Sequence, residues 1–511
     1  MSEAETVSSL LERGQADAPA ILAPERPTLT YGALRALATD TVKTLNSLGI
    51  GRDDRVAIVL PNGPEMATAF VAIAAGATTA PLNPAYRADE FDFYLSDLGA
   101  KALVVEAGST SPALEVAKAR AIPIVTLSVA PGVPAGAFTL SGAAAGKTER
   151  PGMAGPDDIA LVLHTSGTTS RPKIVPLSQR NICASARNIR QTLSLEAKDR
   201  CLNVMPLFHI HGLIAAVLSS LSAGASIYCT PGFNALKFFA WLDDAKPSWY
   251  TAVPTMHQAI LARAERNRES IARAKLRFVR SSSSSLPPQV MAELEGVFTA
   301  PVVEAYGMTE ASHQMASNPL PPRPRKAGTV GIAAGPEIAI MDEDGRLLKQ
   351  GEVGEIVIRG QNVTLGYEAN PKANASAFTN GWFRTGDQGS FDADGYLSLT
   401  GRLKEIINRG GEKISPREVD EVLMDHPAVA QAVTFALPHD KLGEEVAAAI
   451  VLREGKTATE REIRDFAAKR LADFKVPRKV LFLAEIPKGA TGKLQRIGLH
   501  EKLAEQLGLA S

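Results

Sequence analysis

A run of small hydroxyl residues ending in a lysine is the first segment whose residue types could do chemistry. Thr165–Lys173 reads TSGTTSRPK and directly follows the apolar run Asp158–Leu163. Backbone N–H groups and hydroxyls of such a loop can surround a polyphosphate, and the lysine adds positive charge. The spacing differs from GxxxxGK[ST], so this is not a Walker A loop. Taken alone, the segment would usually be an ordinary flexible turn.

A second segment, Tyr306–Glu310 (YGMTE), combines three useful side chains. The aromatic ring can stack on a base, the threonine hydroxyl can meet a phosphate, and the glutamate can hold Mg²⁺. A pentapeptide of this kind is a surface turn in most proteins. Its value depends on what else the chain contains.

Three further segments follow in order along the chain. Gly381–Asp387 (GWFRTGD) ends in a carboxylate that can accept two hydrogen bonds from ribose hydroxyls, and Arg402 follows shortly after. Asn408–Pro416 (NRGGEKISP) contains a Gly-Gly pair, which permits positive φ and close approach of a ligand. Pro487–Gln495 (PKGATGKLQ) places Lys493 on a glycine-containing loop.

Alternating strand-like and helix-like segments must position these loops. Apolar runs occur at Arg55–Leu60, Lys101–Val105, Ile122–Leu127 and Asp158–Leu163. Alanine-rich sequence with helical spacing separates the first two runs. Strands separated by helices predict parallel sheets with crossover helices, and therefore an α/β fold.

The later part of the chain predicts two smaller units. From about residue 325, short strands such as Glu355–Arg359 and Tyr396–Thr400 lie among turn residues and indicate a β-rich, barrel-like part spanning about 325–400. From 403 to 511 we expect a compact α+β domain. Its expected elements are helices at Pro416–His426 and Thr459–Ala472 and strands at Ala432–Leu437 and Val446–Leu452.

The composition is that of an ordinary globular enzyme. Of 511 residues, 55 are Lys or Arg and 55 are Asp or Glu, and this balance argues against a general nucleic-acid or membrane-surface role. The cysteines Cys183, Cys201 and Cys229 show no metal-ligand spacing, which suits a reducing compartment. No signal-peptide pattern is evident, and Met66–Leu82 and Gly212–Tyr228 are too interrupted to span a membrane. We expect a cytoplasmic enzyme with no membrane partner.

Together and in this order, the five segments resemble the adenylate-forming superfamily, which includes acyl-CoA synthetases, 4-coumarate–CoA ligases, luciferases and nonribosomal adenylation domains. The resemblance runs from about residue 10 to 497. It implies a large N-terminal domain, residues 1–402, with two mixed or parallel sheets, helices and a small β-barrel. A small mobile C-terminal domain follows. It also implies that ATP activates a carboxylic acid as an acyl adenylate, which coenzyme A then captures as a thioester.

The resemblance also implies roles for individual residues, with ATP, Mg²⁺ and coenzyme A as the bound small molecules and a monomer or homodimer as the assembly. Lys493 would act in adenylation, Lys404 would be the hinge, and Glu310 would bind Mg²⁺ with Thr309 on phosphate. Tyr306 would stack near adenine, Asp387 and Arg402 would hold the ribose, and Gly410 and Gly411 would line the pantetheine tunnel. The phosphates would be held by Thr165, Ser166, Gly167, Thr168, Thr169 and Lys173, and the other cofactor-binding residues would be Ser284, Glu304, Ala305 and Gly307.

One segment departs from the family pattern. The usual string is TSGTTGxPKGV, whereas this chain reads TSGTTSRPKIV, with Ser170 and Ile174 where glycines are common. If the position of Ile174 requires positive φ, its β-branched side chain would strain the phosphate loop.

The acid pocket of this family is built around three stretches that read here PLFHIHG (206–212), RSSSSSL (280–286) and ASHQM (311–315). They are small, polar and partly cationic, unlike the apolar lining of a fatty-acyl tunnel, and suit a second carboxylate on a very short acid. The strings PLFHIHGL and EAYGMTEASHQMASNPLP resemble those of oxalate–CoA ligases, which implies oxalate as substrate. Candidate acid-binding residues are His209, His211, Arg280, Ser282 and His313.

Plainer interpretations stay open at this point. His209 could be a structural histidine, Arg280 could pair with a core acid, and the serine run could be a tight turn beside adenine. The substrate could instead be malonate, a medium-chain fatty acid or an aryl acid. A carrier-loading module or a non-catalytic nucleotide-binding protein belongs to a different class. It is less favoured because Lys493 and Glu310 are both present and the chain ends soon after Lys493.

Overall fold

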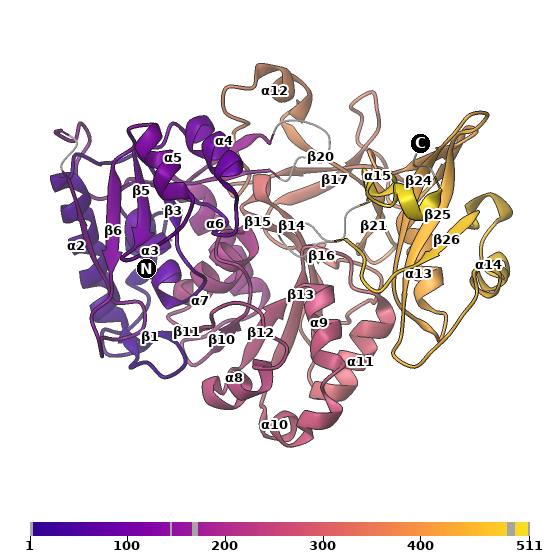
Figure 1. The fold of residues 1–511 in the computed structure, drawn as a ribbon, viewed down its shortest axis with the longest axis horizontal. Coiled ribbons are helices and arrows are strands. Elements are labelled where there is room, and N and C mark those ends of the chain that lie inside the picture. Colours follow the sequence, from indigo (N-terminus) through magenta and orange to yellow (C-terminus); the bar gives the residue numbers. More distant parts are fainter. Residues whose placement is uncertain (1–3, 144–145, 166–171, 488–495, 509–511) are drawn as a thin grey trace.

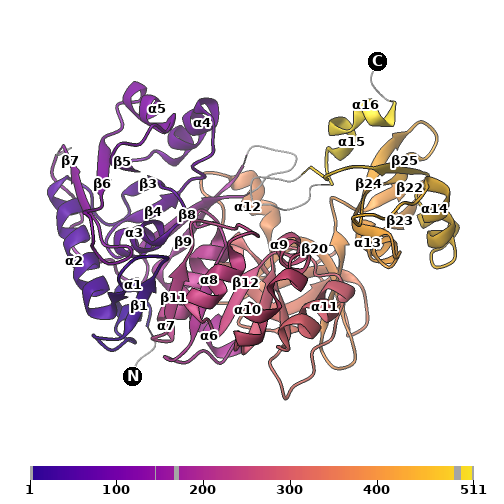
Figure 2. The same cartoon turned by 60° about the horizontal axis from the view of Figure 1, so that its bottom comes forward.

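Two extended sheets make up most of the molecule, and a smaller C-terminal unit lies beside them (Figures 1 and 2). The structure, a computed structural model, describes residues 4–143, 146–165, 172–487 and 496–508. The predicted α/β fold is confirmed. Among the helices of the described residues, none is both long and apolar enough to cross a bilayer.

The first sheet has seven strands in the order β7-β6-β5-β3-β4-β8-β9. The central strands are parallel, and the edge strands β7 and β9 pair antiparallel to β6 and β8. Its strands are β3 Arg55–Val59, β4 Thr78–Pro81, β5 Ala102–Glu106, β6 Ile124–Ser128, β7 Thr139–Gly142, β8 Ile159–His164 and β9 Ile174–Ser178. The sequence predicted β3, β5, β6 and β8. It missed β4, which lies in the same alanine-rich stretch as helix α3 (Pro64–Ala74).

The second sheet has nine strands in the order β16-β15-β14-β13-β12-β10-β11-β1-β2. Strands β1 and β10–β14 are parallel where they pair, so their carboxyl ends share one edge, where ligands bind in open α/β sheets. Its strands are β1 Pro19–Leu22, β2 Leu29–Thr30, β10 Arg200–Asn203, β11 Ser226–Cys229, β12 Trp249–Ala252, β13 Phe278–Ser282, β14 Val302–Met308, β15 His313–Ser317 and β16 Ile332–Ala333.

Buried helices fill the core of this large part. Every residue of α3 except Glu65 is buried, as expected for a helix that is apolar on all sides. The π-helix η1 (His211–Leu218) is buried throughout. The other helices of this part are α1 Val7–Leu11, α2 Tyr31–Ser47, α4 Ala88–Leu98, α5 Ala113–Ala119, α6 Gln179–Thr192, α7 Ser219–Ser222, α8 Phe238–Ala245, α9 Pro254–Leu261, α10 Arg268–Arg273 and α11 Pro288–Phe298, with 3₁₀ turns η2 Glu265–Asn267 and η3 Thr309–Ala311.

The predicted β-rich unit is a five-stranded antiparallel sheet. It comprises β17 Glu337–Met341, β18 Gly354–Arg359, β19 Phe378–Thr379, β20 Trp382–Phe391 and β21 Leu397–Arg402, with α12 Pro371–Ala377 beside it. Strand β20 pairs with β18, β19 and β21, whereas β17 pairs only with β18. The pairings of the described strands form an open antiparallel sheet where the sequence predicted a β-barrel-like part.

The C-terminal unit has its own sheet and its own apolar core, built around Ile407, Leu423 and Ile450. Its elements are β22 Ile407–Arg409, β23 Glu412–Ile414, α13 Pro416–Met424, β24 Val429–His439, β25 Gly443–Leu452, α14 Glu460–Ala468, η4 Asp473–Lys475, β26 Lys479–Phe482, α15 Leu499–Lys502 and α16 Ala504–Leu507. The predicted capping of α14 is confirmed, because the Glu462 amide donates to Thr459 Oγ1 (3.2 Å) and the Thr459 amide donates to Glu462 Oε2 (2.7 Å). The helix ends at Ala468, four residues before the predicted end.

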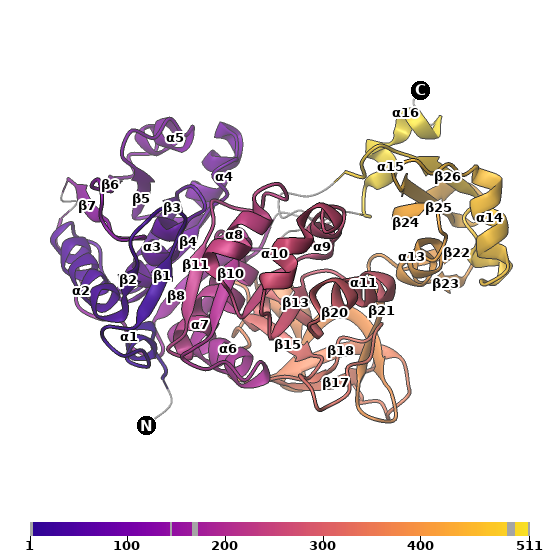
Figure 3. The same cartoon turned by 90° about the horizontal axis from the view of Figure 1, so that it is seen from below.

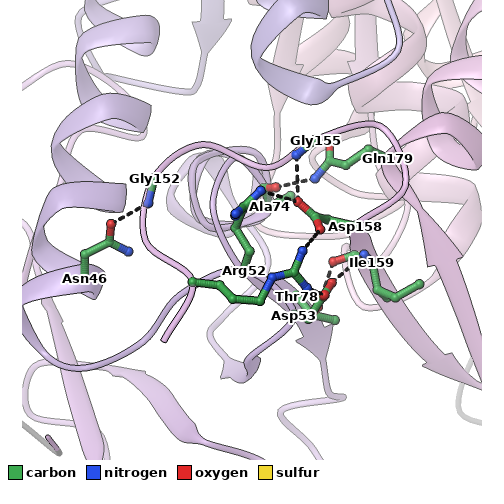
Figure 4. A network of polar contacts seen from close by, with 11 residues as sticks. Asn46, Arg52, Asp53, Ala74, Thr78, Gly152, Gly155, Asp158, Ile159 and Gln179 are labelled. Carbon is green, nitrogen blue, oxygen red and sulfur yellow. Dashed lines mark hydrogen bonds and ion pairs between the residues drawn. The ribbon is translucent and has the colours of Figure 1, made fainter. Parts of the chain in front are cut away.

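A buried carboxylate fixes the start of β8, whose other end carries the phosphate loop (Figure 4). Asp158 accepts from Arg150 Nη2 at 2.6 Å and from the Gly155 amide at 2.7 Å. The amide of Ile159 donates to Asp53 Oδ1 at 2.9 Å. These contacts hold the chain that enters β8 against the loop before β3.

We predict that Asp158→Ala lowers the midpoint of thermal unfolding. The change removes the acceptor of the Gly155 amide and of Arg52 Nη1, and one of the two carboxylates that pair with Arg150, a loss of about 1.5–3 kcal/mol. Asp157→Ala is the matched control, because the Asp157 side chain is 87% exposed in its ion pair with Arg180 and should change stability by less than about 0.5 kcal/mol. Equal shifts of the midpoint in the two variants would contradict the role given to Asp158.

Candidate functional site

The predicted phosphate loop connects two paired strands. Thr165 directly follows β8 and Lys173 directly precedes β9. The Thr165 amide donates to the Lys173 carbonyl at 2.9 Å, and the Lys173 amide donates to Thr165 Oγ1 at 3.2 Å. These bonds extend the hairpin to the base of the loop. The predicted residues inside the loop, Ser166, Gly167, Thr168 and Thr169, together with Ser170, lie outside the described residues.

The strain expected at Ile174 is not present. Ile174 is the first residue of β9, pairs with His164 across the hairpin and does not have positive φ. Its buried side chain packs in the apolar cluster beneath the first sheet. A β-branched residue therefore suits this position, because it continues an extended strand.

Lys173, Tyr367 and Glu310 form a contact chain at the carboxyl end of β14. Lys173 Nζ lies 4.1 Å from the centroid of the Tyr367 ring, and Tyr367 Oη donates to Glu310 Oε1 at 2.8 Å. Burial raises the pKa of Glu310, while the Tyr367 hydrogen bond and the charge of Lys173 oppose that rise. Tyr367 was not predicted as a site residue, although its position after Gly366 in a turn-rich segment could have indicated one.

Glu310 fits a cation that is held mainly by substrate. The described residues contain no cluster of three or more His, Cys, Asp or Glu side chains able to enclose a metal ion. Mg²⁺ is commonly bound by one or two carboxylates together with phosphate oxygens, without an all-protein cage. A single buried carboxylate beside the phosphate loop matches that mode of binding.

Tyr306, Asp387 and Arg402 are brought together as the resemblance implied. Tyr306 Oη donates to an Asp387 carboxylate oxygen, and Arg402 Nε donates to the other at 3.2 Å. Asp387 on β20 faces Arg402 on β21 in the register of the sheet. Burial raises the pKa of Tyr306 well above its usual value, so the hydroxyl stays a neutral donor.

Strand β14 carries several of the other predicted nucleotide-site residues. Gly307 must be glycine, because a Cβ there would lie 1.9 Å from the His313 carbonyl oxygen. The Ala305 carbonyl accepts from Ser282 Oγ at 2.8 Å. Glu304 Oε1 accepts from the Leu286 amide at 2.9 Å, and burial raises the pKa of Glu304 to about 7. Thr309 begins η3 and is half-buried, and Ser284 lies on the loop after β13.

A completely buried arginine lies at the centre of the predicted acid pocket. Arg280 Nη2 donates to Gln314 Oε1 at 3.2 Å, and Nη1 lies 3.4 Å from His211 Nε2 and 3.5 Å from Thr251 Oγ1. No acidic side chain of the described residues lies within ion-pair distance of it, so the alternative of a core ion pair is wrong. Burial lowers the pKa of Arg280 to about 9, which leaves the guanidinium charged at neutral pH.

Two histidines line the same cluster. His211 Nε2 lies 2.6 Å from Thr251 Oγ1, and His211 Nδ1 lies 3.0 Å from Ser283 Oγ. The rings of His211 and His313 are 5.0 Å apart. His211 begins the π-helix η1, a form that often occurs at functional sites.

Backbone strain is concentrated around this cluster. Ser283, Ser312 and His313 have φ values of 75°, 49° and 101°, a region that non-glycine residues rarely occupy. Such conformations persist only where the surrounding structure imposes them, and they are frequent at active sites. The serine run is divided, because Ser281 and Ser282 end β13 and the chain bends at Ser283 and Ser284, so the run as a whole is not the tight turn of one interpretation.

The structure joins some predicted acid-site residues more closely than others. His211, Arg280 and His313 form one cluster, whereas the Ser282 hydroxyl bonds to β14. His209 is half-buried, and its Nδ1 accepts from the His211 amide at 3.3 Å. Thr251 and Gln314 were missed, although Gln314 follows His313 in the quoted motif.

On the C-terminal unit, Gly410 and Gly411 form the turn between β22 and β23 with φ of 60° and 101°, which explains the Gly-Gly pair. Lys404 is exposed. Desolvation lowers the pKa of Lys173, and the positive charge of Lys404 lowers it further. Lys493 lies outside the described residues. The binding and catalytic roles of all these residues remain predictions.

Comparison with known proteins gives a consistent result. Residues 11–368 match the family described as AMP-binding enzyme, and residues 418–493 match its C-terminal domain. The chain is 46% identical to an oxalate–CoA ligase of Arabidopsis thaliana (97% of this chain, 98% of the relative) and 43% identical to one of Saccharomyces cerevisiae (96% and 95%). It is 35% identical to a sulfoacetate–CoA ligase of Cupriavidus necator (94% and 94%).

Among solved structures, ATP-bound MatB from Rhodopseudomonas palustris superposes with a TM-score of 0.88 at 28% identity, covering 98% of this chain and 99% of that chain. The apo form of the same protein gives 0.78 over the same coverage. The family match covers well over half of the chain, and the curated relatives match it almost end to end. This protein therefore belongs to the AMP-binding enzyme family of adenylate-forming acid–CoA ligases.

Proposed function

We propose that this protein is an oxalate–CoA ligase. It converts oxalate and ATP to oxalyl adenylate and pyrophosphate, and then transfers the oxalyl group to coenzyme A with release of AMP. The observation that carries this proposal is the buried positive charge of Arg280, which has no carboxylate partner among the described residues.

A buried charge without a counter-ion is costly, and an incoming carboxylate would balance it. The groups around Arg280 are His211, Thr251, Gln314 and His313, a small polar set that offers little apolar surface to an alkyl chain. A guanidinium recognises a planar carboxylate with two parallel hydrogen bonds. These features favour a short acid with a second anionic group, and the relatives named for oxalate and sulfoacetate agree with that class.

The first half-reaction would take place between the acid cluster and the phosphate loop. A carboxylate oxygen of the acid attacks the α-phosphorus of ATP, the new P–O bond forms, and pyrophosphate leaves. Thr165, Lys173 and Lys493 would stabilise the negative charge that develops on the phosphate. Mg²⁺, held by Glu310, would supply further electrostatic stabilisation of the phosphates.

The second half-reaction requires no enzyme nucleophile, because the thiol of coenzyme A attacks an already activated carbonyl carbon. The thiol proton is lost, the C–O bond to AMP breaks, and a thioester remains. We propose that residues 403–511 rotate about Lys404 between the two steps and present Gly410 and Gly411 to the pantetheine arm. A cytoplasmic location and a monomeric or homodimeric assembly stay predictions.

We predict that Arg280→Met reduces kcat/KM for oxalate by at least about 100-fold, because the charge that balances the second carboxylate is lost. Pyrophosphate release across oxalate, malonate, sulfoacetate, octanoate and 4-coumarate tests both the variant and the substrate. Arg268→Met, at an exposed pair with Glu265, is the control and should leave the panel unchanged. Robust turnover of octanoate or 4-coumarate by the unmodified protein, with none of oxalate, would reject the proposed substrate.

We predict that Tyr367→Phe moves the acidic limb of ATP–pyrophosphate exchange to higher pH. Cation binding requires ionised Glu310, so exchange falls as the pH drops through the pKa of this carboxyl group. The Tyr367 hydrogen bond lowers that pKa, and its removal therefore raises it. Tyr396→Phe is the control, because the Tyr396 hydroxyl donates to the Pro324 carbonyl outside the site. If the acidic limb of the pH profile of exchange does not move in Tyr367→Phe, then Glu310 does not control that limb.

We predict that Lys493→Ala abolishes adenylation and spares thioester formation from supplied acyl adenylate, because the lysine would turn away with its domain between the steps. The two half-reactions are measured separately, as ATP–pyrophosphate exchange and as CoA thioester formation. Equal loss of both would contradict the proposed rotation.

A further inference from the structure

The C-terminal domain, residues 403–511, is hereafter called the lid. It contacts the large domain beside helices α9 and α11 (Figure 3). A cavity of about 140 Å³ separates the two surfaces there. The large domain lines it with Pro254, Ser284 and Ser285, and the lid lines it with Arg417 and Arg496. The cavity marks where the two domains meet without packing their cores together.

One glutamine of the large domain uses both ends of its amide on the lid. Gln258 Nε2 donates to the Ala430 carbonyl at 3.1 Å, and Gln258 Oε1 accepts from Gln431 Nε2 at 3.3 Å. Gln289 on α11 donates to Asp425, just after α13. Polar contacts of this kind can break and reform, because water replaces each partner when the domains separate.

Two charged groups face this interface with unsatisfied atoms. Arg417, at the start of α13, donates from Nε to Glu421 at 2.9 Å, while its Nη1 is buried without a hydrogen-bond partner. Glu304 uses only Oε1, and its buried Oε2 has no partner. The Leu286 amide that donates to Glu304 lies between Ser285 and Pro287, two residues that line the cavity.

Burial raises the pKa of Glu304, and the positive charge of Arg417 lowers it. Reciprocally, an ionised Glu304 stabilises the lid where Arg417 is near. The nearby acids Asp420 and Glu421 partly screen this attraction, and Arg496 pairs with Asp420 at 2.6 Å.

We assign the observed pose of the lid to the adenylation step. The TM-score to MatB is 0.88 for its ATP-bound form and 0.78 for its apo form, so the present arrangement is closer to the former. Arg496, three residues after Lys493, lines the cavity and donates to the Thr434 carbonyl at 3.2 Å. The lid face that meets the large domain is thus the one from which the chain leads to Lys493.

We propose that Gln258 and Gln289 hold the lid in the adenylation pose through their contacts with Ala430, Gln431 and Asp425 on the lid. These residues act by positioning, and their contacts must break before the thioester step. The inference rests on the proposed two-step function, because it assigns the observed pose to the first step.

The first test compares the two half-reactions in Gln258→Ala and Gln289→Ala. Each should lower ATP–pyrophosphate exchange by about 5–10-fold, the equivalent of about 1–1.4 kcal/mol of docking. CoA thioester formation from supplied acyl adenylate should be unchanged or faster. Gln191→Ala, at an exposed glutamine, and Arg461→Met, at a 91% exposed arginine of the lid, are the matched controls. Equal loss of both half-reactions, or unchanged exchange, overturns the proposal.

A second test locks the pose directly with the double variant Gln289→Cys and Asp425→Cys, oxidised to a disulfide. The native cysteines are all buried, so they do not compete. The locked protein should retain exchange and lose thioester formation, and reduction should restore the latter. Loss of exchange with retained thioester formation would assign the pose to the other step and overturn the inference.

The two tests use whichever acid the unmodified protein activates. Failure with oxalate alone would reject only the substrate proposed above. Failure of the unmodified protein to exchange pyrophosphate with any acid would reject the proposed function. The docking inference is judged by the rate of ATP–pyrophosphate exchange divided by the rate of thioester formation, compared with the same ratio in the unmodified protein.

Discussion

The buried contact among Glu310, Tyr367 and Lys173 joins three parts of the molecule that fold around different sheets. Glu310 follows β14 of the nine-stranded sheet, Lys173 precedes β9 of the seven-stranded sheet, and Tyr367 belongs to the segment that leads into β19. Backbone bonds reinforce the junction, since the Thr364 amide donates to the Glu310 carbonyl at 2.7 Å and the Glu368 amide to the Ile174 carbonyl at 3.0 Å. The described ends of the predicted phosphate loop, Thr165 and Lys173, and the proposed cation ligand Glu310 therefore meet at this junction.

The acid cluster shows how stability is exchanged for recognition. A buried guanidinium with no acidic partner among the described residues, and three residues with positive φ, each cost free energy. Gln314 offsets part of this cost, because its amide also donates to Thr192 Oγ1 and to the Ala334 carbonyl, both at 3.1 Å. In the proposed function, an anionic substrate would relieve the remaining imbalance of charge, and binding and specificity would share one physical origin.

The lid combines an independent core with a polar contact surface. Its apolar residues pack among themselves, and the contacts with α9 and α11 are amide and charge interactions around a cavity. Such an interface permits relative motion of domains, whereas a large apolar one would resist it. A two-step reaction in one site requires this kind of surface.

Local patterns in the sequence determined a large share of the fold and of the candidate site. The apolar runs predicted β3, β5, β6 and β8, the Thr459–Glu462 pair predicted the start of α14, and the Gly410–Gly411 pair predicted a positive-φ turn. Each signal lies within a few residues, where spacing and backbone preference decide the outcome. The family resemblance supplied the order of the nucleotide-site segments and the class of reaction.

The tertiary structure alone decided which distant residues meet. Tyr367 is 57 residues from Glu310, Thr251 is 40 from His211, and Gln258 is 172 from Ala430. It also placed Ile174 in an extended strand and left Arg280 without an acid. No local pattern encodes these facts, because they depend on the order of strands in two sheets and on how the lid docks. The sequence therefore determined the kinds of chemical groups available, and the packing of the sheets decided which of them share one site.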